Sequence, residues 1–431
     1  MSWFEQITAK AAQIQSLEEL ETAEARDKFA QGLPQSFTLR ELADVTREPL
    51  NLTSSAKSRD VRTARTQLLS VLTCLRRCGD RITPELSTDH DAVKELALNI
   101  AKLITPVVTQ DQSEVSSQDL LQTSRTVVEQ CQTNAGLGIT VLEALLRQTT
   151  NPVRLENEVL YTLLAYTNEE QSGGSHETED IANRLLEQQF SVPDSSTEEE
   201  FLTETVLQAY LRPLFSQSKP SSITASGRKA EYTENAASKG ESMPDESAVT
   251  KPWKYTDMRS IPAVAWAVRE ANVQLIAQHW PLFIPVLLTL ADDTATPVRR
   301  RGLLILTDFL TKFPDKTLHD TGLAQVFEDA IFPTLSYLPS LTPEEGSVEL
   351  LVPAYSALLC LAKKQPAIGK DGVARAPKNR FLDRMLREGV LGGYFHAKDH
   401  VRIVEVLCQQ TVAILEEMGV HAVKHLKVRV P

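Results

Sequence analysis

The chain has 431 residues, of which 42% are hydrophobic and 24% are charged, and its formal net charge is −12. This length is enough to bury a large core and usually corresponds to more than one compact domain. The acidic balance argues against a protein that wraps nucleic acid, because phosphate binding requires a positively charged surface.

The N-terminal segment has no apolar stretch after a basic start, so it does not indicate a secretory signal. The longest apolar run, residues 282–291, is about half as long as a bilayer-spanning helix must be. The five cysteines are scattered and form no Cys-x-x-Cys pair, which is typical of a reducing compartment. We therefore expect a soluble, intracellular protein without membrane contact.

Helical periodicity dominates the sequence. In residues 61–79, for example, Ala64, Leu68, Leu72 and Leu75 recur at three- and four-residue steps before a terminal glycine. Most other segments show the same pattern, and alternating β-branched runs flanked by hairpin turns do not occur. The pattern predicts an all-α fold.

Residues 216–252 fall outside that pattern, because they contain only four larger apolar side chains. Such a segment buries too little surface to offset the entropy lost on ordering it. We expect a disordered insert here, dividing an N-terminal helical part (1–215) from a C-terminal helical part (253–431). A shorter mobile loop is expected at residues 168–178.

A run of three hydroxyl residues precedes three glutamates in the segment 193–204. The hydroxyls of Ser195, Ser196 and Thr197 suit an acidophilic kinase, and equally the N-terminus of a helix. We expect the helix start, with a capping box formed by Ser196 and Glu199, because acids in the first turn also complement the helix dipole.

An internal repeat indicates how the helices are arranged. Four Val-Arg pairs, beginning at Val61, Val153, Val298 and Val401, each follow a turn and open an apolar helix. Once the insert is subtracted, their spacing corresponds to units of roughly fifty residues, slightly longer than the ~40–47 of HEAT or armadillo repeats. The repeat predicts an α-solenoid of HEAT/armadillo-like units.

The third copy contains an arginine triplet that could face a phosphate outside the protein or a neighbour inside it. Asp292 and Asp293 end the preceding helix, Pro297 is expected at the first helical position, and Arg299 follows. In HEAT repeats an Asp and an Arg at this spacing form a ladder between units, although the other three copies here lack the Asp. We expect Arg299 to bind within the protein and hold the repeat junction together, and the next two arginines to be solvated.

The C-terminal end is basic: residues 351–431 carry 13 Lys and Arg against 7 Asp and Glu, a net +6. Within it Lys378, Arg380, Arg384 and Arg387 lie on or near an amphipathic helix. They form either a partner-binding surface or a solvated face over a buried stripe. For the first, reversing the charges of Arg384 and Arg387 would weaken binding in a salt-dependent way and leave thermal stability nearly unchanged.

Trp266 and Trp280 recur at helical spacing with several phenylalanines. Such aromatics usually pack in the core. Some could instead anchor a protein partner, because interface hot spots favour Trp, Tyr and Arg. Both tryptophans are therefore candidate partner-binding residues.

Several short motifs between residues 259 and 362 carry a family resemblance. In chain order they are Trp280-Pro281-Leu282-Phe283, Asp292-Asp293, Arg301-Gly302-Leu303, Thr321-Gly322-Leu323, Phe332-Pro333-Thr334-Leu335, Leu341-Thr342-Pro343-Glu344 and Pro353-Ala354-Tyr355. They resemble the core of the Tel-two-interacting protein two family, with weaker similarity on both sides of it.

The resemblance implies a non-enzymatic scaffold subunit of the triple-T (TTT) cochaperone complex. The implied direct partner is the long HEAT-repeat subunit of that complex. Through it the chain would meet the other solenoid subunit, the phosphatidylinositol-3-kinase-related kinases (PIKKs) and the heat-shock protein 90 machinery. The kinases link the family to TOR growth signalling, the DNA-damage response and telomere maintenance, and a chromatin-associated assembly is also implied. Cytoplasmic and nuclear localisation follows.

Motifs for chemistry are weak throughout. No P-loop and no Gly-x-Ser-x-Gly occur, and the pairs His396/His400 and His421/His425 lack a third metal ligand. We expect no enzyme activity, no cofactor and no metal. Two other hypotheses about function remain. One is a generic HEAT adaptor in nuclear transport or phosphatase scaffolding. The other is nucleic-acid binding by the basic C-terminal end, which the overall negative charge disfavours.

Overall fold

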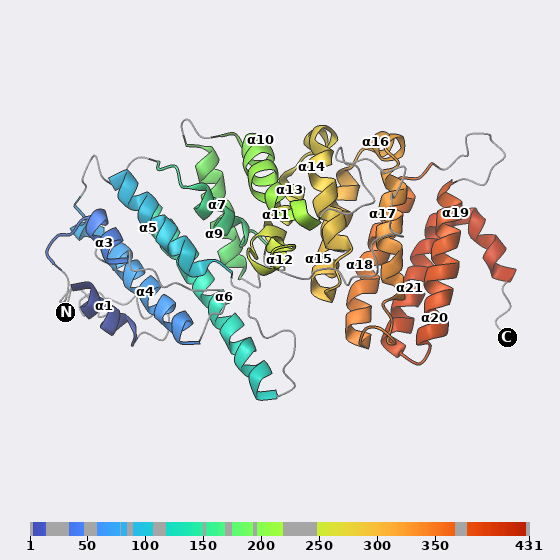
Figure 1. The fold of residues 1–431 in the computed structure, drawn as a ribbon, viewed down its shortest axis with the longest axis horizontal. Coiled ribbons are helices and arrows are strands. Elements are labelled where there is room, and N and C mark those ends of the chain that lie inside the picture. The colour runs from blue at the N-terminus through green and yellow to red at the C-terminus, as the bar shows by residue number, and fades with distance from the viewer. Residues whose placement is uncertain are drawn as a thin grey trace. The chain divides into compact units, whose positions relative to one another are not determined.

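A computed structural model describes residues 3–13, 34–46, 58–77, 79–83, 89–106, 118–149, 152–168, 175–192, 196–218, 248–366 and 377–427. Within these ranges every regular element is a helix, and the one extended pairing is an isolated parallel bridge between Phe37 and Ile82 (Figure 1). The prediction of an all-α fold is confirmed for this part of the chain.

The chain divides into two compact units. The first contains Met1–Val206 and Glu246–Trp266, and the second contains Leu207–Asp245 and Ala267–Pro431. The sequence had placed everything from residue 253 onward in the C-terminal part, whereas the contacts put 246–266 with the first unit. Most of the predicted insert, 219–247, lies outside the described residues.

The first unit is built from helices of very different lengths. They are α1 (Trp3–Ala11), α3 (Leu39–Thr46), α4 (Ser58–Arg77), η2 (Gly79–Arg81), α5 (Asp89–Ile104), α6 (Gln118–Arg147), α7 (Asn157–Leu164), α9 (His176–Phe190), α10 (Glu198–Glu200), α12 (Pro252–Tyr255), and the parts of η4 (Phe201–Leu211) and α13 (Ser260–Glu270) up to residues 206 and 266. Each of α1, α4, α6 and α9 packs against the next in that series, and α3, α5 and α7 form a second series.

Local sequence accounts for two helix starts in this unit. Helix α9 begins at His176 because the Ser175 hydroxyl accepts a hydrogen bond from the Thr178 backbone N–H. The last three residues of the loop predicted at 168–178 are therefore helical, and residues 169–174 lie outside the described part of the chain. Helix α10 opens with a reciprocal capping box between Thr197 and Glu200. The predicted box, Ser196 with Glu199, was wrong by one residue, because the chain still follows an extended path at Thr197.

The second unit continues the helical pattern. Its elements are the end of η4, α11 (Arg212–Phe215), η5 (Ser216–Ser218), the end of α13, α14 (Val273–Ala291), α15 (Thr296–Lys312), α16 (Asp315–Asp320), α17 (Leu323–Ile331), η6 (Phe332–Ser336), α18 (Glu344–Lys363), α19 (Pro377–Arg384), η7 (Met385–Leu391), α20 (Gly392–Ala397), α21 (Val401–Met418) and η8 (Gly419–Lys427). Here α14, α15, α18 and α21 each pack against the next (Figure 1).

Helices α14 and α15 approach unusually closely. A Cβ on Gly302 would lie 2.6 Å from the Leu290 carbonyl carbon and 2.8 Å from the Ala291 nitrogen, so any larger residue at 302 would push the helices apart. Around this contact the rings of Phe283, Phe309 and Phe313 form a continuous buried cluster. The close backbone approach and the packed rings together fix the junction between these two helices.

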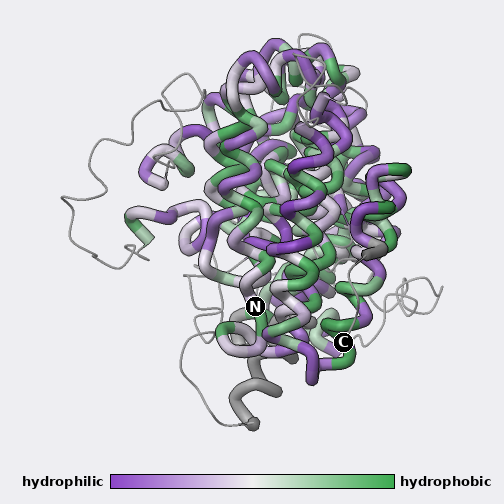
Figure 2. Tube along the Cα trace, turned by 90° about the vertical axis from the view of Figure 1, so that its right-hand side faces the viewer, coloured by the Kyte–Doolittle hydropathy of each residue, from purple (hydrophilic) through white to green (hydrophobic). Residues whose placement is uncertain are grey.

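The helices are amphipathic rather than uniformly apolar. Figure 2 shows hydrophobic and hydrophilic residues alternating in short stretches along the helices, as expected when one face of each helix is buried against its neighbours. Phe381, Leu382, Met385 and Leu386, for example, are buried on α19 and η7 while Arg380 and Arg387 are exposed.

Candidate protein-interaction site

The arginine triplet lies at the junction of α14 and α15, and Arg299 points inward with only 4% of its surface exposed. Its Nε donates a hydrogen bond to the Asp293 carbonyl oxygen at 2.8 Å, and Nη2 donates to the Asp292 carbonyl oxygen at 3.1 Å. Its Nη1 donates to the Thr334 hydroxyl at 3.3 Å, and the guanidinium stacks over the Tyr337 ring at 4.4 Å. Arg299 thus joins α14 and α15 to the segment at and after η6.

The partners of Arg299 differ from those of a side-chain ladder. The contact with Asp293 uses the backbone carbonyl, while the Asp293 carboxylate accepts from the Ala295 N–H at 2.9 Å and shapes the turn. The Asp292 carboxylate is 3.7 Å from Arg299 and its side chain is 71% exposed. Pro297 occupies the second position of α15, not the first; its missing N–H still costs no helical bond.

The two neighbours of Arg299 are unlike each other. Arg300 is exposed, as expected, whereas Arg301 is half-buried. Burial lowers the pKa of the Arg301 guanidinium, and the adjacent positive charge of Arg300 lowers it further. The expectation that both would be solvated was therefore right only for Arg300.

The basic segment at α19 and η7 is largely tied into the fold. Lys378 forms an ion pair with Glu417 of α21. Arg384 pairs with Glu328 of α17, donates from Nε to Glu388 at 2.8 Å, and lies 4.0 Å over the Phe332 ring. Two of the four candidate cations thus bind neighbouring helices of their own unit.

The charges around Arg384 affect one another. The hydrogen bond to Glu388 is the main reason that the pKa of Arg384 is raised. For Glu328, burial raises the pKa of the carboxyl and outweighs the opposing effect of Arg384. The expectation that reversing Arg384 would leave thermal stability unchanged is corrected, because the reversal would place a carboxylate beside Glu328 and Glu388.

The remaining candidates of this segment are placed differently. Arg380 and Arg387 are both exposed, and within the described residues Arg387 has neither a hydrogen bond nor an ion pair. Arg387 is therefore the member of the set that can meet a partner without first leaving an internal one.

The two tryptophans also separate. Trp266 is 3% exposed and its ring meets Phe201 edge-on at 5.8 Å. It packs in the core, so the hypothesis that it binds a partner was wrong. Trp280 is half-buried on α14 and meets Phe313 edge-on at 6.4 Å. It keeps an accessible edge.

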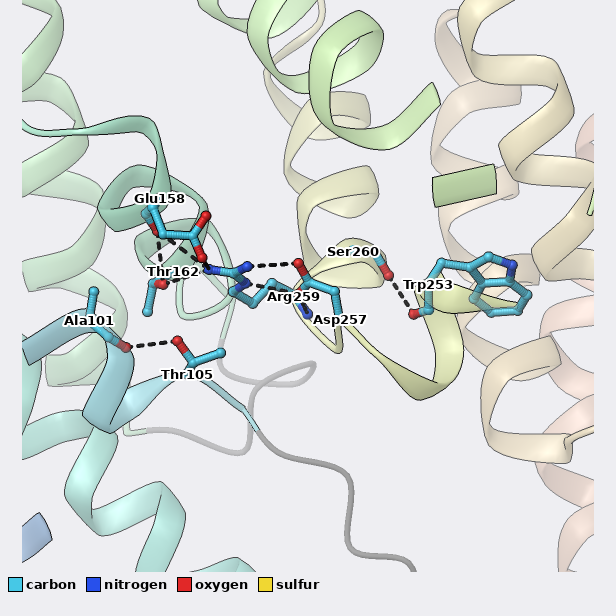
Figure 3. A network of polar contacts seen from close by, with 8 residues as sticks. All are labelled: Ala101, Thr105, Glu158, Thr162, Trp253, Asp257, Arg259 and Ser260. Atoms are coloured by element: carbon cyan, nitrogen blue, oxygen red, sulfur yellow. Dashed lines mark hydrogen bonds and ion pairs between the residues drawn. The ribbon is translucent and has the colours of Figure 1, made fainter. Parts of the chain in front are cut away.

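A charged network in the first unit was not anticipated from the sequence (Figure 3). Arg259, 6% exposed, donates from Nε and Nη2 to both carboxylate oxygens of Asp257, at 2.8 and 2.7 Å. Its Nη1 donates to Glu158 at 2.7 Å and to the Thr162 hydroxyl at 3.1 Å, both on α7. These bonds fasten the segment after residue 246 to the first unit. The local Asp-x-Arg spacing hints at the first pair, but nothing in the sequence indicates the second.

A second omission lies on α20, where Tyr394 and Phe395 are 47% and 76% exposed. A signal for it existed: the small residues Gly393 and Ala397, four apart, mark the buried face of this short helix. Phe395, two residues from each of them, must lie opposite that face, and Tyr394 lies at its side.

One histidine of each pair contacts an acid from another element. His400 Nδ1 lies 3.3 Å from Glu344, and His425 Nε2 lies 2.8 Å from Asp383. His421 and His425 lie on a 3-10 helix, where positions four apart do not share a face. Across the described ranges, no group of three or more His, Cys, Asp or Glu is placed to hold a metal ion.

Two helices of the described part, α14 and α18, are long and apolar enough to cross a bilayer by length and composition. Buried residues make up 50% and 56% of their apolar windows, and both helices pack on α15. Core helices pass the same test, so this finding is weak evidence for a membrane span.

Comparison with known proteins gives one match. The model of the Tti2 family matches residues 159–431, more than half of the chain. The match contains the segment 259–362, on which the resemblance was based, and extends from α7 to the C-terminus. Neither the curated proteins nor the solved structures include a significant match to the chain.

Proposed function

Because the chain belongs to the Tti2 family, we propose that it is a non-enzymatic scaffold subunit of the TTT cochaperone complex. The observation that carries the proposal is the family match, which covers all of α14 to η8. In this role the protein supports the maturation and stability of PIKKs together with the heat-shock protein 90 system.

The proposed architecture is an α-solenoid of HEAT-like repeats. In such an array each helix pair buries its apolar faces against its neighbours and leaves an extended outer surface for a partner. The serial packing of α14, α15, α18 and α21 supports this arrangement for the second unit. The Arg299 junction supports it as well, because one buried side chain fixes two successive helices and the segment that follows.

The proposed direct partner is the long HEAT-repeat subunit of the complex. Through that subunit the protein would reach the other solenoid subunit, the kinases and the heat-shock machinery, and so act in TOR signalling, the DNA-damage response and telomere maintenance. Work in both cytoplasm and nucleus, including a chromatin-associated assembly, follows from this role. Binding is the whole mechanism: no bond is made or broken.

Affinity purification of the tagged, full-length chain followed by mass spectrometry tests the proposal. The expected result is recovery of the long HEAT-repeat subunit in stoichiometric amount, with PIKKs at lower yield. Acute depletion of the chain should then lower the steady-state level of those kinases. Recovery of nuclear-transport factors or of a phosphatase instead would show that the chain is a different kind of HEAT adaptor, and recovery of nucleic acid would show a nucleic-acid-binding protein.

A further inference from the structure

An exposed strip of side chains runs along η7 and α20 near the C-terminal end of the second unit. On it Leu391 is 40%, Tyr394 47% and Phe395 76% exposed, and the two aromatic rings meet at 6.4 Å. Arg387 precedes these residues and Lys398 follows them, and both are exposed. We call these five residues the α20 stripe.

The α20 stripe lies on one side of the helix because the opposite side is buried. Gly393 and Ala397 are buried, and a Cβ on Gly393 would lie 3.4 Å from a methyl group of Leu407 on α21. Leu391, Tyr394, Phe395 and Lys398 are exposed, whereas Val390, Gly393 and Ala397 between them are buried. The stripe is therefore not part of the packing between α20 and α21.

The charges around the stripe are unbalanced. Glu388 is bound by Arg384 at 2.8 Å, and Asp383 is bound by Lys424 and His425. Arg387 and Lys398, in contrast, make neither hydrogen bonds nor ion pairs with any described residue. Two exposed acids are adjacent to these cations in the sequence: Glu388, which Arg384 binds, follows Arg387, and Asp399 follows Lys398. The result is an aromatic centre between two cations that no described carboxylate binds.

We propose that the α20 stripe is the docking surface for an acidic amphipathic helix of a protein partner. Such a helix has an apolar centre that covers Tyr394 and Phe395, and carboxylates about three turns apart that meet Arg387 and Lys398. The proposal rests on the proposed function, since it identifies the chemistry of a helix in the partner subunit. A second copy of this chain fits less well, because a two-fold contact through the stripe would bring like charges together.

The size of the stripe suits the centre of an interface rather than the whole of one. Buried Phe and Tyr side chains remove roughly 150–250 Å² each from water, whereas a standard interface buries about 800 Å² per partner. Hot spots are typically a few aromatic and Arg side chains surrounded by weaker contacts. Phe395 and Tyr394 should therefore dominate the affinity, and the two cations should set its salt dependence.

The test measures binding of the purified full-length chain to the long HEAT-repeat subunit of the TTT complex. The double variant Tyr394→Ala/Phe395→Ala should bind at least about tenfold more weakly. The double variant Arg387→Glu/Lys398→Glu should also bind more weakly, and its deficit should shrink as salt is raised. Leu341→Ala is the matched control, since that leucine is 74% exposed on the loop before α18 and lies off the stripe. Melting temperatures of all variants should match that of the wild type.

The outcomes separate the two proposals. If the wild-type chain does not bind the subunit, the proposed function fails and this inference fails with it. If the wild type binds and both stripe variants bind equally well, only the inference fails.

Photo-crosslinking identifies the occupant directly, using p-benzoylphenylalanine in place of Phe395. The crosslinked peptide should come from a helical segment with acids on both sides of an apolar centre, and a basic or uncharged peptide overturns the proposal. Stripe-dependent binding to phosphatidylserine vesicles, or stripe-dependent dimerisation of the wild-type chain in the ultracentrifuge, would also overturn it.

Discussion

Two buried arginines, one in each unit, hold their junctions by different chemistry. Arg259 is surrounded by formal negative charge: both oxygens of Asp257 and one of Glu158 accept its hydrogen bonds. Arg299 is satisfied mainly by the carbonyl groups of Asp292 and Asp293, a hydroxyl and an aromatic face. A buried guanidinium can thus be bound by carboxylates or by neutral polar groups. We expect the loss of stability on mutation to differ between these two arrangements.

The largest effect is expected for Arg259→Met. Removing the guanidinium leaves the Asp257 carboxylate, whose side chain is 14% exposed, without its cationic partner. Breaking a buried pair in this way typically costs 3–5 kcal/mol. Chemical denaturation should therefore show the first unit unfolding at a much lower denaturant concentration. The double variant Arg259→Met/Asp257→Asn, which removes both charges, should recover part of the loss; no recovery would mean that packing and not charge holds this junction.

A smaller loss is expected for Arg299→Met, about 1–3 kcal/mol. The substitution removes the Arg299 donor from two neutral carbonyl oxygens, which costs less than removing the cation from a buried carboxylate. Hydrogen exchange should show faster opening at the start of α15 and around Thr334. A loss equal to that of Arg259→Met would contradict the distinction between carboxylates and dipoles.

Arg384 combines both modes and is less buried, with 38% of its side chain exposed. It pairs with Glu328 and Glu388 and lies over Phe332. Because exposed pairs contribute about 0–1 kcal/mol and repulsion is added, Arg384→Glu should cost on the order of 1 kcal/mol. Arg387→Glu, three residues away, is the matched control and should leave the melting temperature unchanged. Equal melting temperatures for both variants would mean that the contacts of Arg384 do not stabilise the fold.

The pH dependence of stability sharpens the same point. Burial raises the pKa of Glu328 in the folded chain, so the folded state binds this proton more tightly than the unfolded state. The contribution of Glu328 is then fully present at low pH and is lost as pH rises through its folded pKa. The unfolding free energy of the wild type relative to Glu328→Gln should fall between acidic and neutral pH, by less than the Arg259 effect. A difference that rises with pH would show that Arg384 outweighs burial.

The sequence was informative where partners are close along the chain. Arg299 and its two aspartates lie within eight residues, so the junction between α14 and α15 could be predicted. Whether the carboxylate or the carbonyl of Asp293 is used depends on the turn geometry, which spacing does not define. The all-α fold was predictable for the same reason, because helical periodicity is a local property.

Long-range pairings could not be predicted. Arg259 meets Glu158 101 residues earlier, and Arg384 meets Glu328 56 residues earlier. Periodicity placed Arg384 on the polar side of its helix but did not reveal that another helix lies against that side. The same limit explains Trp266, where the sequence could not show that Phe201 covers the ring.

The smallest effect is expected for Asp292→Asn. The Asp292 side chain is 71% exposed and 3.7 Å from Arg299, so its Coulombic attraction is weak and screened by solvent. The backbone carbonyl that accepts the hydrogen bond at 3.1 Å remains in the variant, and the unfolding free energy should change by less than about 0.5 kcal/mol. Asp257→Asn in the first unit is the comparison variant, because there the carboxylate itself accepts the hydrogen bonds. It should lower the free energy of unfolding several times more than Asp292→Asn. Equal effects of the two substitutions would contradict the distinction between the junctions. They would mean that removing a carboxylate charge costs as much where backbone carbonyls bind the arginine as where carboxylates bind it.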